Sequence, residues 1–139
     1  MKEIIHTVEI EAPMTSVEEA LTTESGLSSW WTRGVSVQSD RISFTFEQGF
    51  NPVMRVEERE PGTLVAWAPE SGADPWMGST IRFELREKDG KSGILFRHRY
   101  AQDLPDEMFG VFNFNWAYYL ESLRQLCEKG TGTPFQPEG

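Results

Sequence analysis

The feature that most constrains this chain is a long helical pattern near its C-terminus, in a sequence whose other patterns predict strands. Asp103 suits the cap of this helix, Pro105 suits its first turn, and Gly130 stands where a terminating glycine belongs. A helix of about 24 residues would be about 36 Å long, enough to cross a small sheet. One face carries large apolar side chains at about 100° per residue, which predicts that this face packs on the sheet. These side chains are Phe109, Phe112, Trp116, Tyr119, Leu120, Leu123 and Cys127.

The remaining patterns predict one strand, two short helices and about six further strands before the long helix. Residues 3–11 alternate apolar and polar side chains with a period of two, which is typical of a half-buried strand. Thr15 or Ser16 is expected to cap the first short helix. Between residues 35 and 100 the alternating segments are separated by short turns, which favours an antiparallel meander. We therefore expect a curved antiparallel sheet with the long helix across its concave face.

Composition limits the class of protein. The chain has 139 residues, 22 acidic against 13 basic side chains and a formal charge of -9, so we expect one domain over residues 1–139. The negative surplus repels phosphate backbones and anionic lipid, which predicts no nucleic-acid and no membrane partner. The single Cys127 rules out an internal disulfide and a cysteine-based zinc site. A charged N-terminus at Lys2, without a long apolar run, favours a cytoplasmic protein.

Several short motifs stand in a characteristic order along the chain. They are Ile10–Pro13, Val17, Ala20–Thr22, Leu27, Trp30-Trp31, Gly78, Phe83–Leu85, Phe96–His98, Trp116, Leu120, Leu123 and Gly130–Phe135. This order resembles the activator-of-Hsp90-ATPase-like branch of the START-like (SRPBCC) superfamily. The resemblance implies an α+β helix-grip fold, in which a seven-stranded antiparallel sheet grips the C-terminal helix around an apolar cavity.

The resemblance does not imply one chemistry, because the superfamily includes lipid carriers, cyclases, plant hormone receptors and many members of unknown role. The eukaryotic activator also carries a separate N-terminal domain that binds the chaperone. A single domain of 139 residues has no room for it, so a chaperone-activating role with Hsp90 is not expected.

The two histidines are candidate polar groups inside such a cavity. His6 and His98 both lie on the apolar faces of their strands, and the helix-grip fold makes these strands neighbours. They either fix a ligand oxygen or move a proton near neutral pH, or they are bonded to backbone or water for structural reasons. We favour the structural role. Two histidines without further ligand spacing predict no metal, and no cofactor motif is present.

Aromatic residues make up 12% of the chain and suggest a pocket for an apolar ligand. The alternative is ordinary core packing, which is the stronger interpretation for the stripe on the long helix. The predicted cavity lining is Trp67, Ile81, Phe83, Phe96, Phe109, Phe112 and Trp116, with His6 and His98 as polar contacts, and Trp30, Trp31 and Trp76 at the mouth.

Two other groups of side chains have open assignments. Phe114 and Tyr118 lie on the opposite side of the long helix, either as a dimer contact or packed within the monomer, so the chain is expected to be a monomer or a weak homodimer. The acidic residues alternate with arginines, which favours a solvated sheet face. Arg55 is the exception, because it would anchor a ligand carboxylate if it pointed inward.

These patterns favour a binding protein for a small apolar, aromatic or lipid-like molecule. No nucleophile elbow or phosphate-binding loop is present. The alternatives are a cyclase- or hydrolase-type enzyme that uses the same cavity, and a protein-interaction module related to stress or chaperones.

Overall fold

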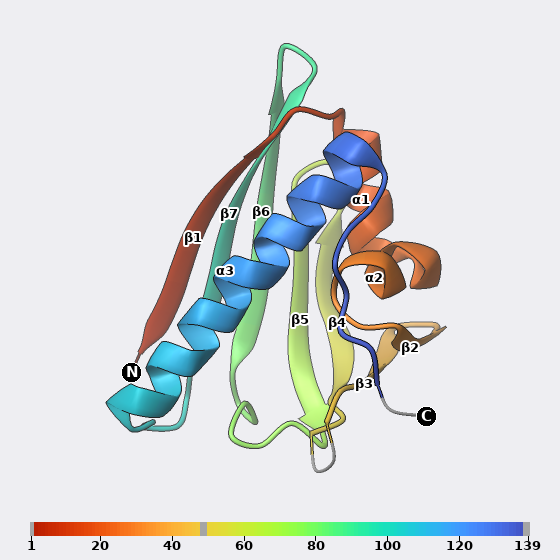
Figure 1. Cartoon of the computed structure of the whole chain (residues 1–139). Coiled ribbons are helices and arrows are strands. Elements are labelled where there is room, and N and C mark those ends of the chain that lie inside the picture. Colours follow the sequence, from red (N-terminus) through yellow and green to blue (C-terminus); the bar gives the residue numbers. More distant parts are fainter. Residues whose placement is uncertain (1, 48–49, 138–139) are drawn as a thin grey trace.

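The structure is a computed structural model that describes residues 2–47 and 50–137. In these residues the chain forms one seven-stranded sheet and three helices (Figure 1). The elements are β1 (Glu3–Ile10), α1 (Met14–Thr22), α2 (Glu24–Trp30), β2 (Gly34–Gln38), β3 (Arg41–Thr45), β4 (Val53–Glu60), β5 (Leu64–Ser71), β6 (Thr80–Lys88), β7 (Lys91–Arg99) and α3 (Asp106–Lys129).

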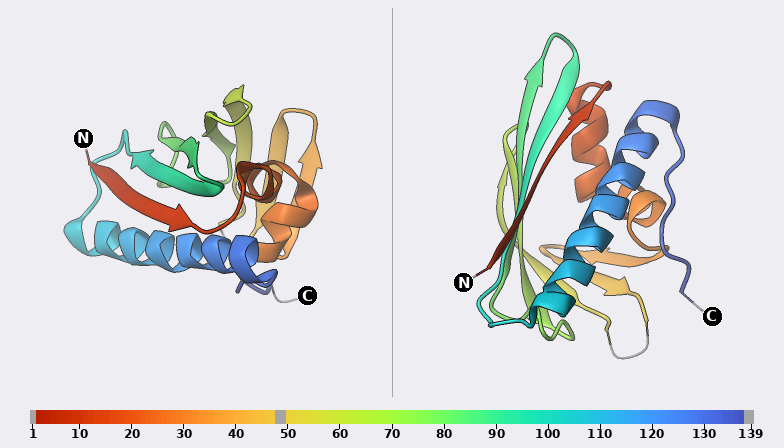
Figure 2. Two further views of the ribbon diagram at one scale, coloured as in Figure 1. Left: turned by 90° about the horizontal axis from the view of Figure 1, so that it is seen from above. Right: turned by 60° about the vertical axis from the view of Figure 1, so that its left-hand side comes forward.

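The sheet is antiparallel throughout and follows the order β1-β7-β6-β5-β4-β3-β2. The first strand therefore pairs with the last, while the other strands follow one another as a meander. Helix α3 crosses one face of the curved sheet, and α1 and α2 pack on the same side beside its C-terminal half (Figures 1 and 2). This arrangement confirms the predicted helix-grip fold.

The apolar stripe of α3 faces the sheet as predicted. Trp116, Leu120 and Leu123 are buried, and Phe109 and Phe112 are partly buried against the same core. Gly130 ends the helix in a left-handed conformation with φ of 84°, and its N–H donates to the carbonyl oxygen of Leu126. Glycine adopts this conformation without steric strain, so this predicted terminus is correct.

The start of α3 differs from the predicted one. The helix begins at Asp106 with Pro105 in the cap position, and Asp103 does not cap it. The extended backbone of Pro105, with ψ of 145°, leads straight into the first turn. Asp106 and Glu107 occupy that turn, where their charges favour the positive end of the helix dipole.

The start of α1 also differs. Pro13 takes the cap position, and neither Thr15 nor Ser16 caps the helix. The N–H of Met14 instead donates to the carboxylate of Glu87 on β6, at 2.8 Å. A carboxylate from a distant strand thus takes the place of a local hydroxyl as the cap. This is possible because a buried or half-buried N–H needs an acceptor, and any suitably placed oxygen can serve.

The polar tail after Gly130 returns along the molecule beside α2 (Figure 1). Its Phe135 N–H donates to the carbonyl oxygen of Trp31 at 2.9 Å, so the tail is fixed to the residue that follows α2. The hydroxyl of Ser122, buried on α3, donates to the Trp30 carbonyl oxygen at 2.8 Å. These bonds hold the tail, α2 and α3 together.

Replacing Gly26 with alanine should destabilise the fold by about 1–3 kcal/mol. The added Cβ would collide with the Glu19 carbonyl oxygen and lie 2.6 Å from the Ala20 Cα, and neither backbone atom moves freely. Urea unfolding followed by circular dichroism measures the change.

The matched control is Gly110→Ala on α3, where nothing lies within 4 Å of the added Cβ. Alanine there should stabilise the protein by about 0.5–1 kcal/mol, because glycine is a poor residue in a helix interior. Equal effects from the two substitutions would contradict the close approach of α1 and α2.

Candidate functional site

All five tryptophans of the chain gather around Trp31, which follows α2. Its ring centroid lies 5.1 Å from that of Trp116 on α3 and 5.8 Å from that of Trp67 on β5. Trp30 and Trp76 lie at 5.7 and 6.5 Å, with their rings within 14° of parallel to that of Trp31. The five rings therefore form one buried cluster that joins α2, β5, the loop before β6, and α3.

A groove of about 410 Å³ opens beside this cluster, and its wall is mostly aromatic. Among the described lining residues, three carry polar side chains: the Glu47 carboxylate, the Asn115 amide and the Tyr119 hydroxyl. Burial, and then the nearby Tyr118 and Glu47, raise the pKa of Tyr119, so its hydroxyl stays protonated at neutral pH. The lining residues are Trp31, Phe46, Glu47, Phe50, Trp76, Val111, Phe112, Asn115, Trp116, Tyr119 and Phe135.

Four residues that the sequence predicted for a cavity or its mouth line this groove. Phe112 and Trp116 come from α3, and Trp31 and Trp76 come from the two loops that flank it. Trp31 and Trp76 are themselves buried, so they form the inner wall and do not stand free at an entrance.

The other predicted lining residues lie elsewhere. Trp67, Ile81, Phe83 and Phe96 are buried in the core between sheet and helix. Trp30 is also fully buried, and its Nε1 donates to the Ala20 carbonyl oxygen at 2.7 Å. Phe109 lies at the outer end of the helix stripe. Its ring centroid is 5.8 Å from that of Tyr100 and 5.1 Å from the Lys2 ammonium nitrogen.

Several lining residues were not predicted from the sequence, because they come from segments far apart in the chain. Phe135 lies in the polar tail. A single large aromatic side chain in such a segment is the sequence signal that could have pointed to it. Phe46 and Phe50 both lie between β3 and β4 in the chain, and their ring centroids are 5.8 Å apart. Phe46 also lies 5.2 Å from Trp31 and 5.7 Å from Phe135, which joins these segments into one wall.

His98 is held in one neutral form by its neighbours. The indole N–H of Trp116 donates to Nδ1 at 3.0 Å, and an indole nitrogen can only donate. The ring proton must therefore sit on Nε2, which lies 2.9 Å from the hydroxyl oxygen of Ser79 and donates to it. Burial lowers the pKa of His98 from 6.5 to about 3, so the ring is uncharged at neutral pH.

His6 lies apart from this network. It is opposite Phe96 in the register of β1 and β7, and it lines a separate hollow against α3 with Leu120. No hydrogen bond joins the two histidines, and His6 Nε2 has no partner, within the part of the chain that the structure describes. The predicted pair is therefore two single histidines in different surroundings.

Two buried donors beside the groove also lack acceptors. Among the described residues, neither Trp76 Nε1 nor the Tyr100 hydroxyl has a hydrogen-bond partner. Both rings pack on Phe112, with centroids at 5.6 and 6.0 Å, and both contact His98. Burial raises the pKa of Tyr100, so its hydroxyl remains a donor. An unsatisfied buried donor costs about 1–3 kcal/mol, so each of these two groups is a local cost of the core packing.

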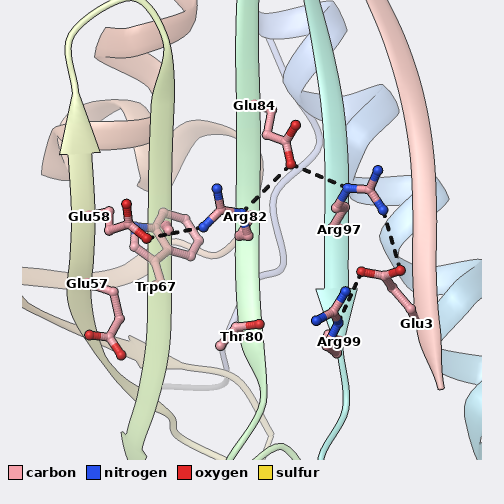
Figure 3. Close-up of a pocket in the computed structure, with 10 residues that line it drawn as sticks. Glu3, Glu57, Glu58, Trp67, Thr80, Arg82, Glu84, Arg97 and Arg99 are labelled. Atoms are coloured by element: carbon pink, nitrogen blue, oxygen red, sulfur yellow. Dashed lines mark hydrogen bonds and ion pairs between the residues drawn. The ribbon is translucent and has the colours of Figure 1, made fainter. Parts of the chain in front are cut away.

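The convex face of the sheet has a different character. A hollow of about 490 Å³ there is crossed by a ladder of ion pairs (Figure 3). Arg82 pairs with Glu58 at 3.2 Å, Arg97 with Glu84 at 3.3 Å, and Arg99 with Glu3 at 3.5 Å. The charges compensate one another, and exposed pairs of this kind contribute little to stability. The hollow is the solvated face that the alternating charges predicted.

Arg55 belongs to the same outer face. Its guanidinium lies 3.0 Å from the Glu57 carboxylate, and both side chains are substantially exposed. Its strand neighbour Met54 points inward and is fully buried. Arg55 therefore does not reach the concave side as an anchor for a ligand.

The described residues hold neither a cluster of metal-ligating side chains nor a helix fit to cross a membrane. No group of three or more potential metal-ligating side chains occurs in the described residues. In the same part of the chain, no helix is long and apolar enough to cross a membrane.

Comparison with known proteins gives a family and a fold. The family described as activator of Hsp90 ATPase homolog 1-like protein has a sequence model that matches residues 11–128. The solution structure of the Aha1 dimer from Colwellia psychrerythraea is 32% identical to this chain with a TM-score of 0.83, over 95% of this chain and 100% of that one. No curated protein matches the chain.

Two more distant structures are similar in fold alone. The crystal structure of SSP2350 from Staphylococcus saprophyticus is 17% identical with a TM-score of 0.75, over 95% of this chain and 96% of that one. DynU16, a protein of the dynemicin biosynthetic locus, is 16% identical with a TM-score of 0.75, over 95% of this chain and 49% of that one.

The burial of neutral His98 predicts a pH dependence of stability. Between pH 6.5 and about 3 the unfolded chain binds a proton that the folded chain does not. Stability is therefore full above pH 6.5 and falls as the pH drops, by up to about 1.4 kcal/mol per pH unit. Urea unfolding at pH 7, 6 and 5 measures this slope.

The control is His98→Gln, which removes the titrating group. This variant should be less stable than the wild type at pH 7 but should lose less stability between pH 7 and 5. Parallel slopes for the two proteins would show that His98 is not the group responsible.

Proposed function

The chain belongs to the family of activator of Hsp90 ATPase homolog 1-like proteins, and from that premise we propose that it binds a small apolar molecule in the aromatic groove. The fold is consistent with ligand-binding or polyketide-cyclase-like roles. The observation that carries the proposal is the groove itself, whose volume of about 410 Å³ lies in the range of small-molecule sites. Its ring-lined wall favours an aromatic or lipid-like ligand.

The polar groups of the groove suggest how such a ligand is oriented. The inner wall is formed by the rings of Trp31, Trp76 and Trp116, which favours the apolar body of the ligand. Asn115 and Tyr119 offer hydrogen bonds from the helix side. The Glu47 carboxylate and the net charge of -9 disfavour an anion. We therefore infer a neutral molecule with at least one hydrogen-bonding group.

Binding is favoured over catalysis by the state of His98. Both of its ring nitrogens are occupied, one by Trp116 and one by Ser79, so neither is free to transfer a proton to a ligand. Among the described lining residues of the groove, Glu47 carries the only carboxylate, and no hydrogen bond or ion pair between described residues links it to a second titratable side chain.

The proposal also covers the oligomeric state and the cellular compartment. The Colwellia relative was solved as a dimer, and we extend a homodimer to this chain. Hsp90 is not proposed as a partner. Burial raises the pKa of the lone Cys127 thiol to about 11, which leaves it protonated and unreactive, as suits a single domain in the cytoplasm.

Filling the groove should abolish ligand binding. Nile red, a neutral fused-ring dye that fluoresces in apolar sites, is expected to bind the wild type saturably with one site per chain. Asn115→Phe places a ring in the groove and should raise the dissociation constant at least tenfold, about 1.4 kcal/mol. A fluorescence titration measures the constant.

The matched control is Asn113→Phe, an exposed asparagine of the same helix outside the groove lining. It should leave the dissociation constant unchanged. Native mass spectrometry of protein purified without detergent then identifies any molecule that the wild type retains and Asn115→Phe loses. No saturable dye binding to the wild type, or equal binding by both variants, would count against the proposal.

A further inference from the structure

Helix α3 contains a long stretch without charge. From Met108 to Leu120, thirteen residues, there is no acidic or basic side chain. A quarter of the chain is charged, so a stretch of that length would ordinarily carry about three charges. The solvent-facing side of a helix ordinarily carries charged or polar side chains, so the lack of charge here is unusual for an exposed helix.

The side that faces away from the sheet is nevertheless exposed in one chain. Phe114 is 72% exposed, and Met108, Val111 and Tyr118 are 40%, 53% and 49% exposed. At 100° per residue these four side chains fall within about 120° of one another, so they form one stripe, here called the outer stripe. Helices α1 and α2 and the tail lie beside the C-terminal half of α3 and leave this part bare (Figures 1 and 2).

We infer that the outer stripe binds a second copy of this chain, and that the partner closes the open side of the aromatic groove. The inference rests on the proposed function for its second half. Val111 belongs to both features, since it lines the groove and stands in the outer stripe. Asn115 and Tyr119, about one and two turns further along the same edge of α3, also line the groove. A helix laid on the outer stripe therefore overhangs the groove.

Charge favours a second copy as the occupant. Two chains of charge -9 repel each other, and the repulsion is least where neither surface carries charge. The uncharged stretch of α3 is such a surface, and it is bounded by Glu107 at one end and Glu121 at the other. Packing the same stripe against itself about a two-fold axis keeps both sets of carboxylates outside the contact.

The size of the outer stripe predicts a weak dimer. The exposed fractions of its four side chains correspond to roughly 400 Å² per copy, given about 150–250 Å² for each large side chain. A total near 800 Å² is below the ~1,200 Å² of a standard stable interface. We therefore expect a dimer that dissociates in the micromolar range, with some added contact from the covered groove.

Sedimentation equilibrium over a range of concentrations tests the interface. Phe114→Glu places a charge at the centre of the outer stripe and should raise the dimer dissociation constant at least tenfold. Ile5→Glu is the matched control, because Ile5 is 49% exposed on a different element, β1. It should leave the constant unchanged. If circular dichroism shows that Phe114→Glu is unfolded, Phe114→Gln replaces it in the test. Phe114→Gln should also raise the dimer dissociation constant.

The same proteins test the closing of the groove. Nile red should bind the wild-type dimer at least threefold more tightly than it binds Phe114→Glu or the dilute wild-type monomer. Equal affinity would overturn the closing role but leave both the dimer and the proposed function standing. No dye binding to any form would overturn the proposed function, whereas the interface is tested separately, by sedimentation and by vesicle flotation.

Three results would overturn the interface. The first is a wild type that stays monomeric at all concentrations, and the second is a Phe114→Glu variant that dimerises as well as Ile5→Glu. The third is flotation of the wild type, but not of Phe114→Glu, with phosphatidylcholine vesicles, which would assign the outer stripe to a membrane surface.

Discussion

The packing of Trp31 is the interaction on which the rest of the structure depends. Its ring meets Phe44 of β3 at 4.5 Å, Trp67 of β5 at 5.8 Å and Trp116 of α3 at 5.1 Å. Aromatic pairs of this kind contribute about 0.5–1.5 kcal/mol each beyond the area that they bury. Its carbonyl oxygen also accepts the N–H of Phe135 and so fixes the tail. The same residue thus joins sheet, long helix and tail, and the groove inherits a rigid wall from the core.

The network of His98 sets a second constraint, on where α3 lies along the sheet. Trp116 has to lie opposite one position of β7 to donate to Nδ1, and Ser79, the residue before β6, has to meet Nε2 from the other side. A buried polar network that is fully satisfied specifies one arrangement more sharply than apolar contacts do. The cost is chemical, because a histidine bonded at both nitrogens has no lone pair left for a ligand. The network therefore fixes Trp116 in the wall of the groove without serving as a reacting group.

The fold could be predicted from the sequence because periodicity and turn residues act locally. The stripe that includes Trp116 and Leu123 and the end of α3 at Gly130 are decided within a few residues. The groove could not be predicted in the same way, because its wall joins Phe46, Phe135 and α3 across most of the chain. The start of α1 was predicted wrongly for the same reason, since the acceptor for the N–H of Met14 is Glu87 on the distant strand β6. Large aromatic residues suggested an apolar pocket but not its place, because core and groove use the same residue type.

A helix that forms the wall of a site and also an interface ties the two equilibria together. Val111 stands at the junction of the groove and the outer stripe, so a partner on the stripe changes what surrounds a bound ligand. If the dimer holds the ligand more tightly by some factor, the ligand must tighten the dimer by the same factor, because coupling free energies are reciprocal. A contact too small to be stable alone then becomes stable once the groove is filled. Ligand binding in the groove would in this way change the fraction of dimer, with no large movement of the fold.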